Sequence, residues 1–532
     1  MKLFKKLAAA LVATMLVMAM VGTSAFAATV KNSGTTPVDI TSHTFKAYPV
    51  FTGTQGSGST LSDIKWADGF DAEGFVTELA GEFTEKGFAT TKSATEIADI
   101  IGTFTSFSED AEKIAQIAYK HKGATGVTLT IPTTEMDAGY YLVVDETVVD
   151  GKDDVANAAL LQVTDTITIT VKTDKPSVEK KVIENVKYAE SGTGILSYNS
   201  GSYLVKHEND TADYNIGDDV PFRLHSVAPD MSDYVGPYVY IFHDTMAASL
   251  TYNGDAKLYV NGTEVASGKY EPKISGQELT VKIPNLKDIA NKGDLVTVEF
   301  TAKLNKNALI GRATDGSGTG NVNKVYLEYS NQPNYEGSGT KTGKTPEDKV
   351  IVFTYKLDVN KVDPSGTLLD GAKFKFYKLS GSTPVYVTVD GEKKVDSWTT
   401  NSGTATEFVS TSGTFGIIGL DDGEYWLVET EAPANYNKLP APIKVVITAD
   451  TTNGQEGNAL VTELADVFVK ADGKSGTTSS GTDMALSFDV ENKAGTILPS
   501  TGGIGTTIFY VLGAILVLGG GVLLVTRRRM AA

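Results

Sequence analysis

The chain has 532 residues, a formal net charge of −18 and no cysteine. So acidic a protein repels nucleic acid and anionic lipid, and without cysteine it forms neither disulfides nor thiolate metal sites. Its length is too great for one core, and three or four domains of usual size are expected between the apolar ends. Gly, Thr, Val and Tyr are abundant while long helical patterns are scarce, which indicates a mainly β chain of sandwich domains in series.

Residues 1–27 are predicted to be a secretory signal peptide. Three lysines precede an apolar stretch from Leu7 to Val21, and Ala25-Phe26-Ala27 forms an A-x-A cleavage site. The mature chain is therefore expected to begin near Ala28. Neither this segment nor the chain beyond Thr501 carries an acidic residue, so removing their six basic residues changes the net charge from −18 to −24.

Residues 28–172 are predicted to form an N-terminal domain of strands with a few short helices. Strand-like alternation opens and closes the segment, and its middle is clearly helical. Ser93 and Glu96 fit a capping box, and the isoleucines of residues 97–101 share one helical face. Residues 114–118 repeat that spacing. We interpret these apolar faces as core and not as a ligand site.

Residues 172–182 are predicted to link this domain to the first strand of the next. Pro176 interrupts strand pairing, so the segment around it is expected to be exposed. Its position resembles the end of the N-terminal domain in shaft pilins of Gram-positive pili, where a YPKN-type motif supplies the lysine that accepts the next subunit. The Tyr-Pro and Asn of that motif are absent here. The resemblance implies Lys172 or Lys175 as the acceptor, and the choice between them stays open.

Residues 173–353 are predicted to form a many-stranded β-sandwich. Asn253-Gly254 and Asn261-Gly262 are turn signals between apolar, alternating stretches. A smaller third domain on the same plan is expected over residues 354–494. The strands predicted for the middle domain are 219–224, 238–242, 258–260, 279–283, 296–300 and 325–329, the last of these being the final strand.

The third domain contains the sharpest internal motif. Leu357, Val359 and Lys361 have the same parity on a strand, so Lys361 faces the core if its apolar neighbours do. Near the other end, Val490 and Asn492 also share one parity. A lysine and an asparagine are thus expected to point into one core, where an unexplained lysine is costly.

Between these two strands lies the sequence YWLVETEAP, residues 425–433. The set resembles the collagen-adhesin B-type domain, with its V-x-K-V-D opening, its Y-x-L-x-E-T-x-A-P box and its closing asparagine. In that family the lysine and asparagine form a spontaneous isopeptide bond beside the glutamate. The resemblance implies Lys361 as nucleophile, Asn492 as electrophile and Glu429 as proton shuttle. Burial favours this chemistry because it lowers the pKa of an amine and raises that of a carboxyl group.

The second domain offers a weaker copy of the motif. The V-x-K spacing recurs at Lys180. The larger, A-type relatives use an aspartate in a D-T-L segment, and the resemblance of the Phe-His-Asp-Thr-Met sequence implies Asp244 as the acid. The asparagine is expected to be Asn323, at the start of the final strand, with Asn331 as its rival. The first domain shows no complete triad.

Residues 495–532 combine a motif, an apolar span and a basic tail. Leu498-Pro499-Ser500-Thr501-Gly502 precedes an uncharged run from about Ile508 to Val525, which reaches about 27 Å as a helix and can span a bilayer. Three arginines keep the tail cytoplasmic, so the preceding chain lies outside the cell. The order resembles the cell-wall sorting signal of Gram-positive surface proteins. It implies a sortase that cuts after Thr501 and passes the Thr501 carboxyl group to an amine.

Other chemistries have little support. The five histidines are scattered with no HExxH motif, so no metal site is expected and no cofactor is implied. Over nearly its whole length the chain resembles isopeptide-forming fimbrial proteins. That resemblance implies a shaft subunit rather than an enzyme, exported, polymerised and anchored to the cell wall. Its implied partners are pilin-specific and housekeeping sortases, identical subunits, peptidoglycan, and minor pilins or a host ligand.

The alternative hypothesis is a monomeric wall-anchored adhesin that binds a host or extracellular ligand. Such a protein shares every one of these features except the acceptor lysine. The sequence identifies neither the ligand nor the partner sortase.

Overall fold

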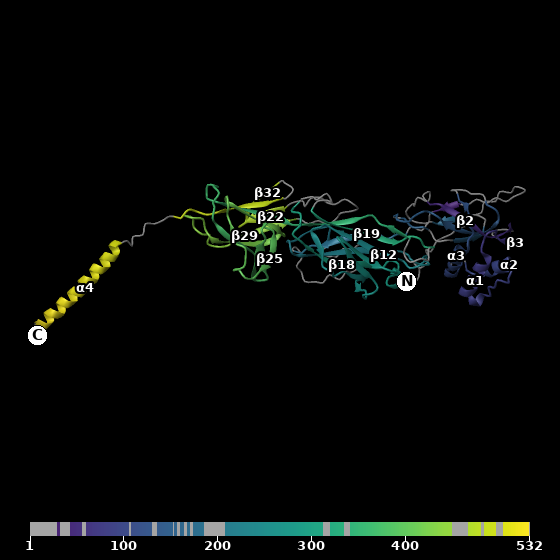
Figure 1. Cartoon of the computed structure of the whole chain (residues 1–532), viewed down its shortest axis with the longest axis horizontal. Helices are drawn as coiled ribbons and strands as arrows, with labels where there is room; N and C mark the ends of the chain where they lie inside the picture. The colour runs from purple at the N-terminus through teal and green to yellow at the C-terminus, as the bar shows by residue number, and fades with distance from the viewer. Residues whose placement is uncertain are drawn as a thin grey trace.

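The computed structural model places three folded units one after another along an elongated molecule (Figure 1). The expected mainly β architecture is confirmed. The predicted signal peptide, Lys172 and the motif Leu498–Gly502 lie outside the described residues. The structure describes residues 29–31, 43–55, 60–105, 108–129, 136–152, 154–156, 160–163, 168–170, 174–185, 208–311, 320–334, 341–449, 467–479, 484–495 and 504–530.

The N-terminal unit combines a five-stranded sheet with helices. The sheet has the order β3-β2-β5-β6, with β4 paired to β2, while β1 and β7 pair separately in parallel. Its strands are β1 (Thr29–Lys31), β2 (Phe45–Gln55), β3 (Leu61–Trp66), β4 (Val127–Thr128), β5 (Gly139–Asp145), β6 (Leu160–Val163) and β7 (Thr168–Thr170). Its helices are α1 (Ala72–Glu82), η2 (Thr84–Lys86), α2 (Ala94–Ile101) and α3 (Glu109–His121).

The helices of this unit begin at side-chain caps. The predicted capping box is present at α2, where the Glu96 amide donates to Ser93 Oγ at 3.3 Å and the Ser93 amide donates to the Glu96 carboxylate at 2.8 Å. Helix α1 was not predicted, because Gly74 weakens its helical pattern. It starts at Asp71, which caps the Gly74 amide at 3.0 Å, and it buries Phe75 and Leu79.

The middle sandwich, which we define as β8 to β21, consists of two seven-stranded sheets. One has the order β15-β14-β18-β11-β8-β9 with β13 on β18, and the other β10-β21-β19-β12-β17-β16 with β20 on β19. Its elements are β8 (Glu179–Ile183), β9 (Glu208–Asn209), β10 (Thr211–Asp213), β11 (Asp219–Val227), β12 (Tyr240–Met246), β13 (Leu250–Tyr252), β14 (Lys257–Val260), β15 (Thr263–Glu264), β16 (Glu271–Ser275), β17 (Glu278–Ile283), η3 (Leu286–Asp288), β18 (Leu295–Leu304), β19 (Asn321–Ser330), β20 (Thr342–Lys344) and β21 (Asp348–Phe353).

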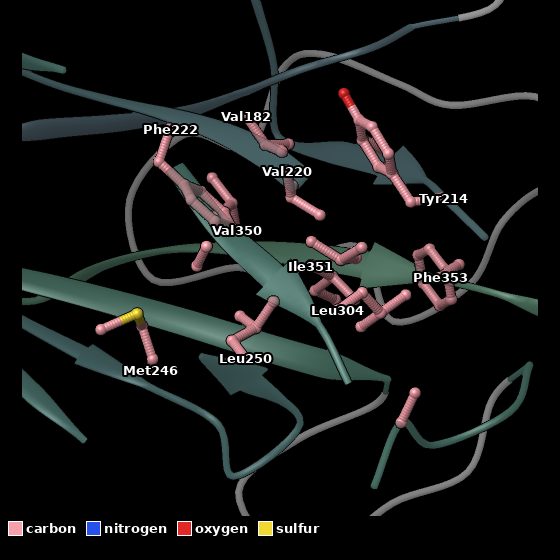
Figure 2. Close-up of a cluster of buried hydrophobic side chains, with 14 of the residues drawn as sticks. Val182, Tyr214, Val220, Phe222, Met246, Leu250, Leu304, Val350, Ile351 and Phe353 are labelled. Atoms are coloured by element: carbon pink, nitrogen blue, oxygen red, sulfur yellow. The ribbon is translucent and has the colours of Figure 1, made fainter. Parts of the chain in front are cut away.

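Side chains from both sheets form one continuous core. Figure 2 shows Val182 of β8 and Phe222 of β11 gathered with Ile351 and Phe353 of β21, and all four are buried. One prediction is wrong: the strand that opens near Asn323 is not the last of this sandwich, because β20 and β21 follow it. Apolar and polar residues alternate clearly in β19. Strand β20 is too short to show this alternation, and the end of β21 is entirely apolar.

The C-terminal sandwich, β22 to β33, has a four-stranded sheet of order β27-β22-β33-β32 and an eight-stranded sheet of order β25-β24-β23-β28-β29-β30-β31, with β26 on β23. Its first and last strands, β22 and β33, are parallel neighbours that pair Lys361 with Val490. The strands are β22 (Tyr355–Val362), β23 (Lys373–Ser380), β24 (Thr383–Val389), β25 (Val395–Thr399), β26 (Phe408–Val409), β27 (Thr414–Leu420), β28 (Gly423–Glu431), β29 (Ile443–Ala449), β30 (Val467–Ala471), β31 (Lys474–Ser475), β32 (Thr477–Thr478) and β33 (Leu486–Glu491).

The described part of the chain ends in helix α4 (Ile504–Met530). Among the described helices it is the one long and apolar enough to cross a membrane, over Phe509–Arg528. This agrees with the span predicted from the sequence. The domain boundaries proposed at residues 172/173, 353/354 and 494/495 stay predictions.

Candidate functional site

Lys361 and Asn492 meet where the first and last strands of the C-terminal sandwich run side by side. The Lys361 side chain is fully buried, and its Nζ donates to the Val490 carbonyl at 2.9 Å and to the Val362 carbonyl at 3.1 Å. Asn492 is also buried, and its backbone amide donates to the Val362 carbonyl at 3.0 Å. The Lys361 amine and the Asn492 backbone amide thus donate to the same carbonyl, that of Val362, which brings the two residues together between the strands.

Glu429 reaches this pair from β28 in the opposite sheet. Its two carboxylate oxygens accept hydrogen bonds from Asn492 Nδ2 at 2.8 and 3.1 Å, and the Leu439 amide donates to one of them at 2.7 Å. Burial lowers the pKa of Lys361, although the charge of Glu429 opposes that shift. The site therefore places an amine that is shifted toward its neutral, nucleophilic form beside an amide whose nitrogen is held by a carboxyl group.

The middle sandwich buries a second lysine against a carboxyl group. Lys180 on β8 pairs with Asp244 on β12, and both side chains are inaccessible to solvent. The Lys180 amine also lies 5.0 Å from the ring centre of Phe222 and 5.2 Å from that of Phe300. Burial lowers the pKa of Lys180 and raises the pKa of Asp244, each against the effect of the other's charge. Both groups are thereby shifted toward their neutral forms.

Asn323 is the asparagine that the fold brings toward this pair. It lies on β19 opposite Met246, two residues along β12 from Asp244, and is fully buried. Its amide interacts electrostatically with Asp244, but by distance and angle neither amide atom makes a hydrogen bond within the described residues. Buried amides without hydrogen bonds are unusual in folded proteins. They occur where a side chain has a chemical role, and Asn323 fits that description.

Asn331 lies elsewhere. Its Nδ2 donates to the Val149 carbonyl at 2.5 Å and to the Asp154 carbonyl at 3.2 Å. Its backbone carbonyl accepts from the Ala156 amide at 3.0 Å. These contacts join the middle sandwich to the N-terminal unit. The geometry therefore favours Asn323 over Asn331 as the partner of Lys180.

The linker before the middle sandwich presents Lys175 at the surface. Lys175 is exposed, and it lies between buried Pro176 and Asp174. The Asp174 carboxylate accepts from the Asp230 amide at 2.8 Å and lies 3.4 Å from Lys292 Nζ, which holds the linker against the middle sandwich. Lys172 lies outside the described residues, and the choice between Lys172 and Lys175 stays a prediction.

His243 neighbours Asp244 on β12 but was not singled out from the sequence, where the histidines appeared scattered. Its ring nitrogens lie 2.8 Å from Glu278 Oε1 and 2.9 Å from Glu328 Oε2, and its ring stacks on Tyr326 at 4.5 Å. Burial lowers the pKa of His243, but the hydrogen bonds to the two glutamates outweigh it and the net shift is upward. Protonated His243 thus ties three strands together behind the buried pair.

Comparisons with known proteins agree with this architecture. Residues 355–458 match the prealbumin-like fold domain, and residues 490–531 match the LPXTG cell wall anchor motif. The trypsin-resistant surface T6 protein of Streptococcus pyogenes serotype M6 is 26% identical over 417 residues, which are 68% of this chain and 70% of that protein. These findings support a sortase-assembled backbone pilin. They also support a location at the cell-wall surface, in agreement with the C-terminal apolar helix.

Two solved structures are also similar to this chain. The T6 backbone pilin of serotype M6 Streptococcus pyogenes is 16% identical with a TM-score of 0.48, covering 90% of this chain and 100% of that one. The group B streptococcus pilus 2b backbone protein is 25% identical with a TM-score of 0.39, covering 54% of this chain and 97% of that one.

The two glutamates around His243 predict a stability that depends on pH. Because the folded pKa of His243 is raised above its usual value near 6.5, the stabilisation is complete below about pH 6.5 and is lost as pH rises through the higher folded pKa. His243→Gln should therefore lower the melting temperature of the middle sandwich most in mildly acidic buffer and least in alkaline buffer. Lys273→Gln, on exposed β16, is the control and should show no such trend. A His243→Gln deficit that is constant from pH 5.5 to 9 would contradict this account.

Proposed function

We propose that this backbone pilin closes its middle and C-terminal sandwiches with self-formed isopeptide bonds and is then joined into a shaft by a sortase. The observation that carries the proposal is the arrangement of Lys361, Glu429 and Asn492 around one buried point. An amine, an amide and a carboxyl group meet there without solvent, from three strands that are far apart in the sequence. Burial of this kind favours a neutral nucleophile.

The reaction in the C-terminal sandwich balances without any added reagent. Lys361 Nζ attacks the side-chain amide carbon of Asn492 and forms a new C–N bond. A proton from the attacking amine passes through the Glu429 carboxyl group to the departing Asn492 nitrogen, which leaves as ammonia. Hydrogen bonds of 2.8 and 3.1 Å between that nitrogen and Glu429 support this role for the acid. The product is an amide that ties β22 to β33.

The same chemistry in the middle sandwich uses Lys180, Asp244 and Asn323. Here the lysine and the asparagine come from different sheets, since β8 and β19 lie in the two facing layers. The bond would therefore join the layers instead of two neighbouring strands. The close pairing of Lys180 with Asp244 supports proton transfer between them before attack.

Assembly would use the C-terminal end of the exterior and the linker that follows the N-terminal unit. A pilin-specific sortase would cut after Thr501 and transfer its carboxyl group to Lys172 or Lys175 of an identical subunit. A housekeeping sortase would attach the last subunit to peptidoglycan. The exposed position of Lys175 and the anchor match at residues 490–531 support this sequence of events. Minor pilins or a host ligand would bind to the assembled fibre.

Intact mass spectrometry of the mature exterior, residues 28–497, tests the internal bonds. The native chain should lack the mass of two ammonia molecules, and Glu429→Ala and Asp244→Ala should each lack only one, because each acid serves one bond. The controls are Glu431→Ala, two residues along the same strand, and Asp255→Ala, an exposed aspartate near β14. Asn323→Ala should lose one bond while Asn331→Ala keeps both. A native mass equal to that of the sequence would exclude the bonds.

Cell-wall extracts on denaturing gels test polymerisation. The native protein should give a ladder of covalent multimers, and Thr501→Ala should abolish it. Loss of the ladder in Lys172→Ala or Lys175→Ala would identify the acceptor, with Lys269→Ala as an exposed-lysine control. If the double variant still forms ladders, the linker is not the acceptor. If the native chain gives only a monomer, the protein is a wall-anchored adhesin and not a shaft subunit.

A further inference from the structure

A group of acidic side chains lies where the middle sandwich meets the C-terminal sandwich. Glu184 directly follows β8, Asp213 is the last residue of β10, and Asp422 lies in the turn between β27 and β28. One oxygen atom from each of these three carboxyl groups lies within 4.8 Å of the other two. Asp421 is next to them and is buried. Elements from both sandwiches therefore supply oxygen atoms to one small volume.

The joint is tightly packed around this group. The Ile216 amide donates to the Gly419 carbonyl at 3.0 Å, and an added Cβ at Gly419 would lie 2.5 Å from the Ile216 side chain. Asn215 Oδ1 accepts from the Asp421 amide at 3.2 Å. Because these contacts link β10 with the β27–β28 turn, the acidic group is held by a preformed interface.

Asp213 distinguishes this group from ordinary surface acids. Its side chain is 1% exposed, and by distance and angle neither carboxylate oxygen has a hydrogen-bond partner among the described residues, although Glu184 and Tyr355 interact with it electrostatically. Asn185 Oδ1 and the Tyr355 hydroxyl are also buried without such a partner in the described part of the chain. Buried polar atoms are almost always satisfied by protein, water or an ion, so several unsatisfied oxygens at one point indicate a missing ligand.

The atoms that converge here indicate that the ligand is a cation. Three carboxyl groups from two sandwiches each supply one oxygen, and the amide oxygen of Asn185 lies beside them. Carboxyl and amide oxygens bind cations, whereas they would repel an anion.

We infer that Glu184, Asp213 and Asp422 form a binding site for a calcium ion at the joint between the two sandwiches. Two oxygens that bind Ca²⁺ at about 2.4 Å can lie at most about 4.8 Å apart, which the spacing of these ligand atoms satisfies. An all-oxygen set suits a hard cation and not a soft transition metal. Asn185 adds a neutral oxygen at the edge of the site. Its Nδ2 donates to the Asp421 carboxylate at 3.0 Å, which leaves its Oδ1 for the ion.

Such an ion would fix the orientation of one sandwich relative to the other. It would bind at once to carboxyl groups that follow β8, end β10 and lie in the β27–β28 turn. The site was not visible in the sequence, because Asp422 lies more than two hundred residues after Glu184 and Asp213 and the three acids share no local motif.

Calorimetric titration of calcium into the metal-free mature chain tests the inference. We expect one site with a dissociation constant of about 10⁻⁴ to 10⁻³ M, as in extracellular calcium modules, or lower. Terbium, a calcium mimic, should bind there and emit on tyrosine excitation, because Tyr355 lies beside Asp213. Asp213→Asn should weaken binding at least tenfold. Glu271→Gln, an equal charge change on exposed β16, should leave it unchanged.

The half-buried Asp422 provides a second variant if Asp213→Asn fails to fold. Asp422→Asn should also weaken calcium binding at least tenfold while keeping the native circular dichroism spectrum. No binding to the native chain at 10 mM calcium would overturn the inference, as would unchanged affinity in the folded variants. Neither result depends on pilus assembly or on the isopeptide bonds, because both are measured on the isolated chain.

Discussion

Two lysine side chains buried inside sandwich cores are the constraint on which the rest of the structure depends. An uncompensated charge at either position would cost several kcal/mol, so each core must supply an acid and a reaction partner. Lys361 has Glu429 and Asn492, while Lys180 has Asp244 and Asn323 nearby. Conversion of each amine into an amide would remove its charge permanently. In a chain without cysteine, it would also give each sandwich a covalent tie.

The two ties would carry force differently. In the C-terminal sandwich, Lys361 and Asn492 belong to the first strand and to the end of the last one, so a bond would bypass nearly the whole unit. In the middle sandwich the chain continues through β20 and β21 after Asn323. Force transmitted through the bond to Asn323 must therefore reach β21 through the backbone hydrogen bonds between antiparallel β19 and β21. In that pairing Asn323 lies opposite Val350. The Lys180 amide also donates to Asp348 on β21 at 2.6 Å, which strengthens this uncovered segment.

Local patterns predicted much of the fold and part of the site. Alternating parity was enough to turn Lys361 toward the core, because strand periodicity needs no tertiary information. The choice between Asn323 and Asn331 required tertiary information, since both lie on or beside β19 and only their neighbours in space differ. The same holds for Glu184, Asp213 and Asp422, which belong to separate elements. Helix α1 was missed because Gly74 obscures the spacing of Phe75 and Leu79, although Asp71 before it was a readable cap.

The most direct test of the central claim is to stretch single molecules of the exterior between its two ends. If both cores are covalently tied, the segments 181–322 and 362–491 should add no length at forces that unfold ordinary sandwiches, while the N-terminal unit extends. Residues 324–353 are the one part of the middle sandwich that the tie leaves free to lengthen. Full extension of either sandwich in the native chain would show that its buried lysine is held by packing alone and would contradict the account.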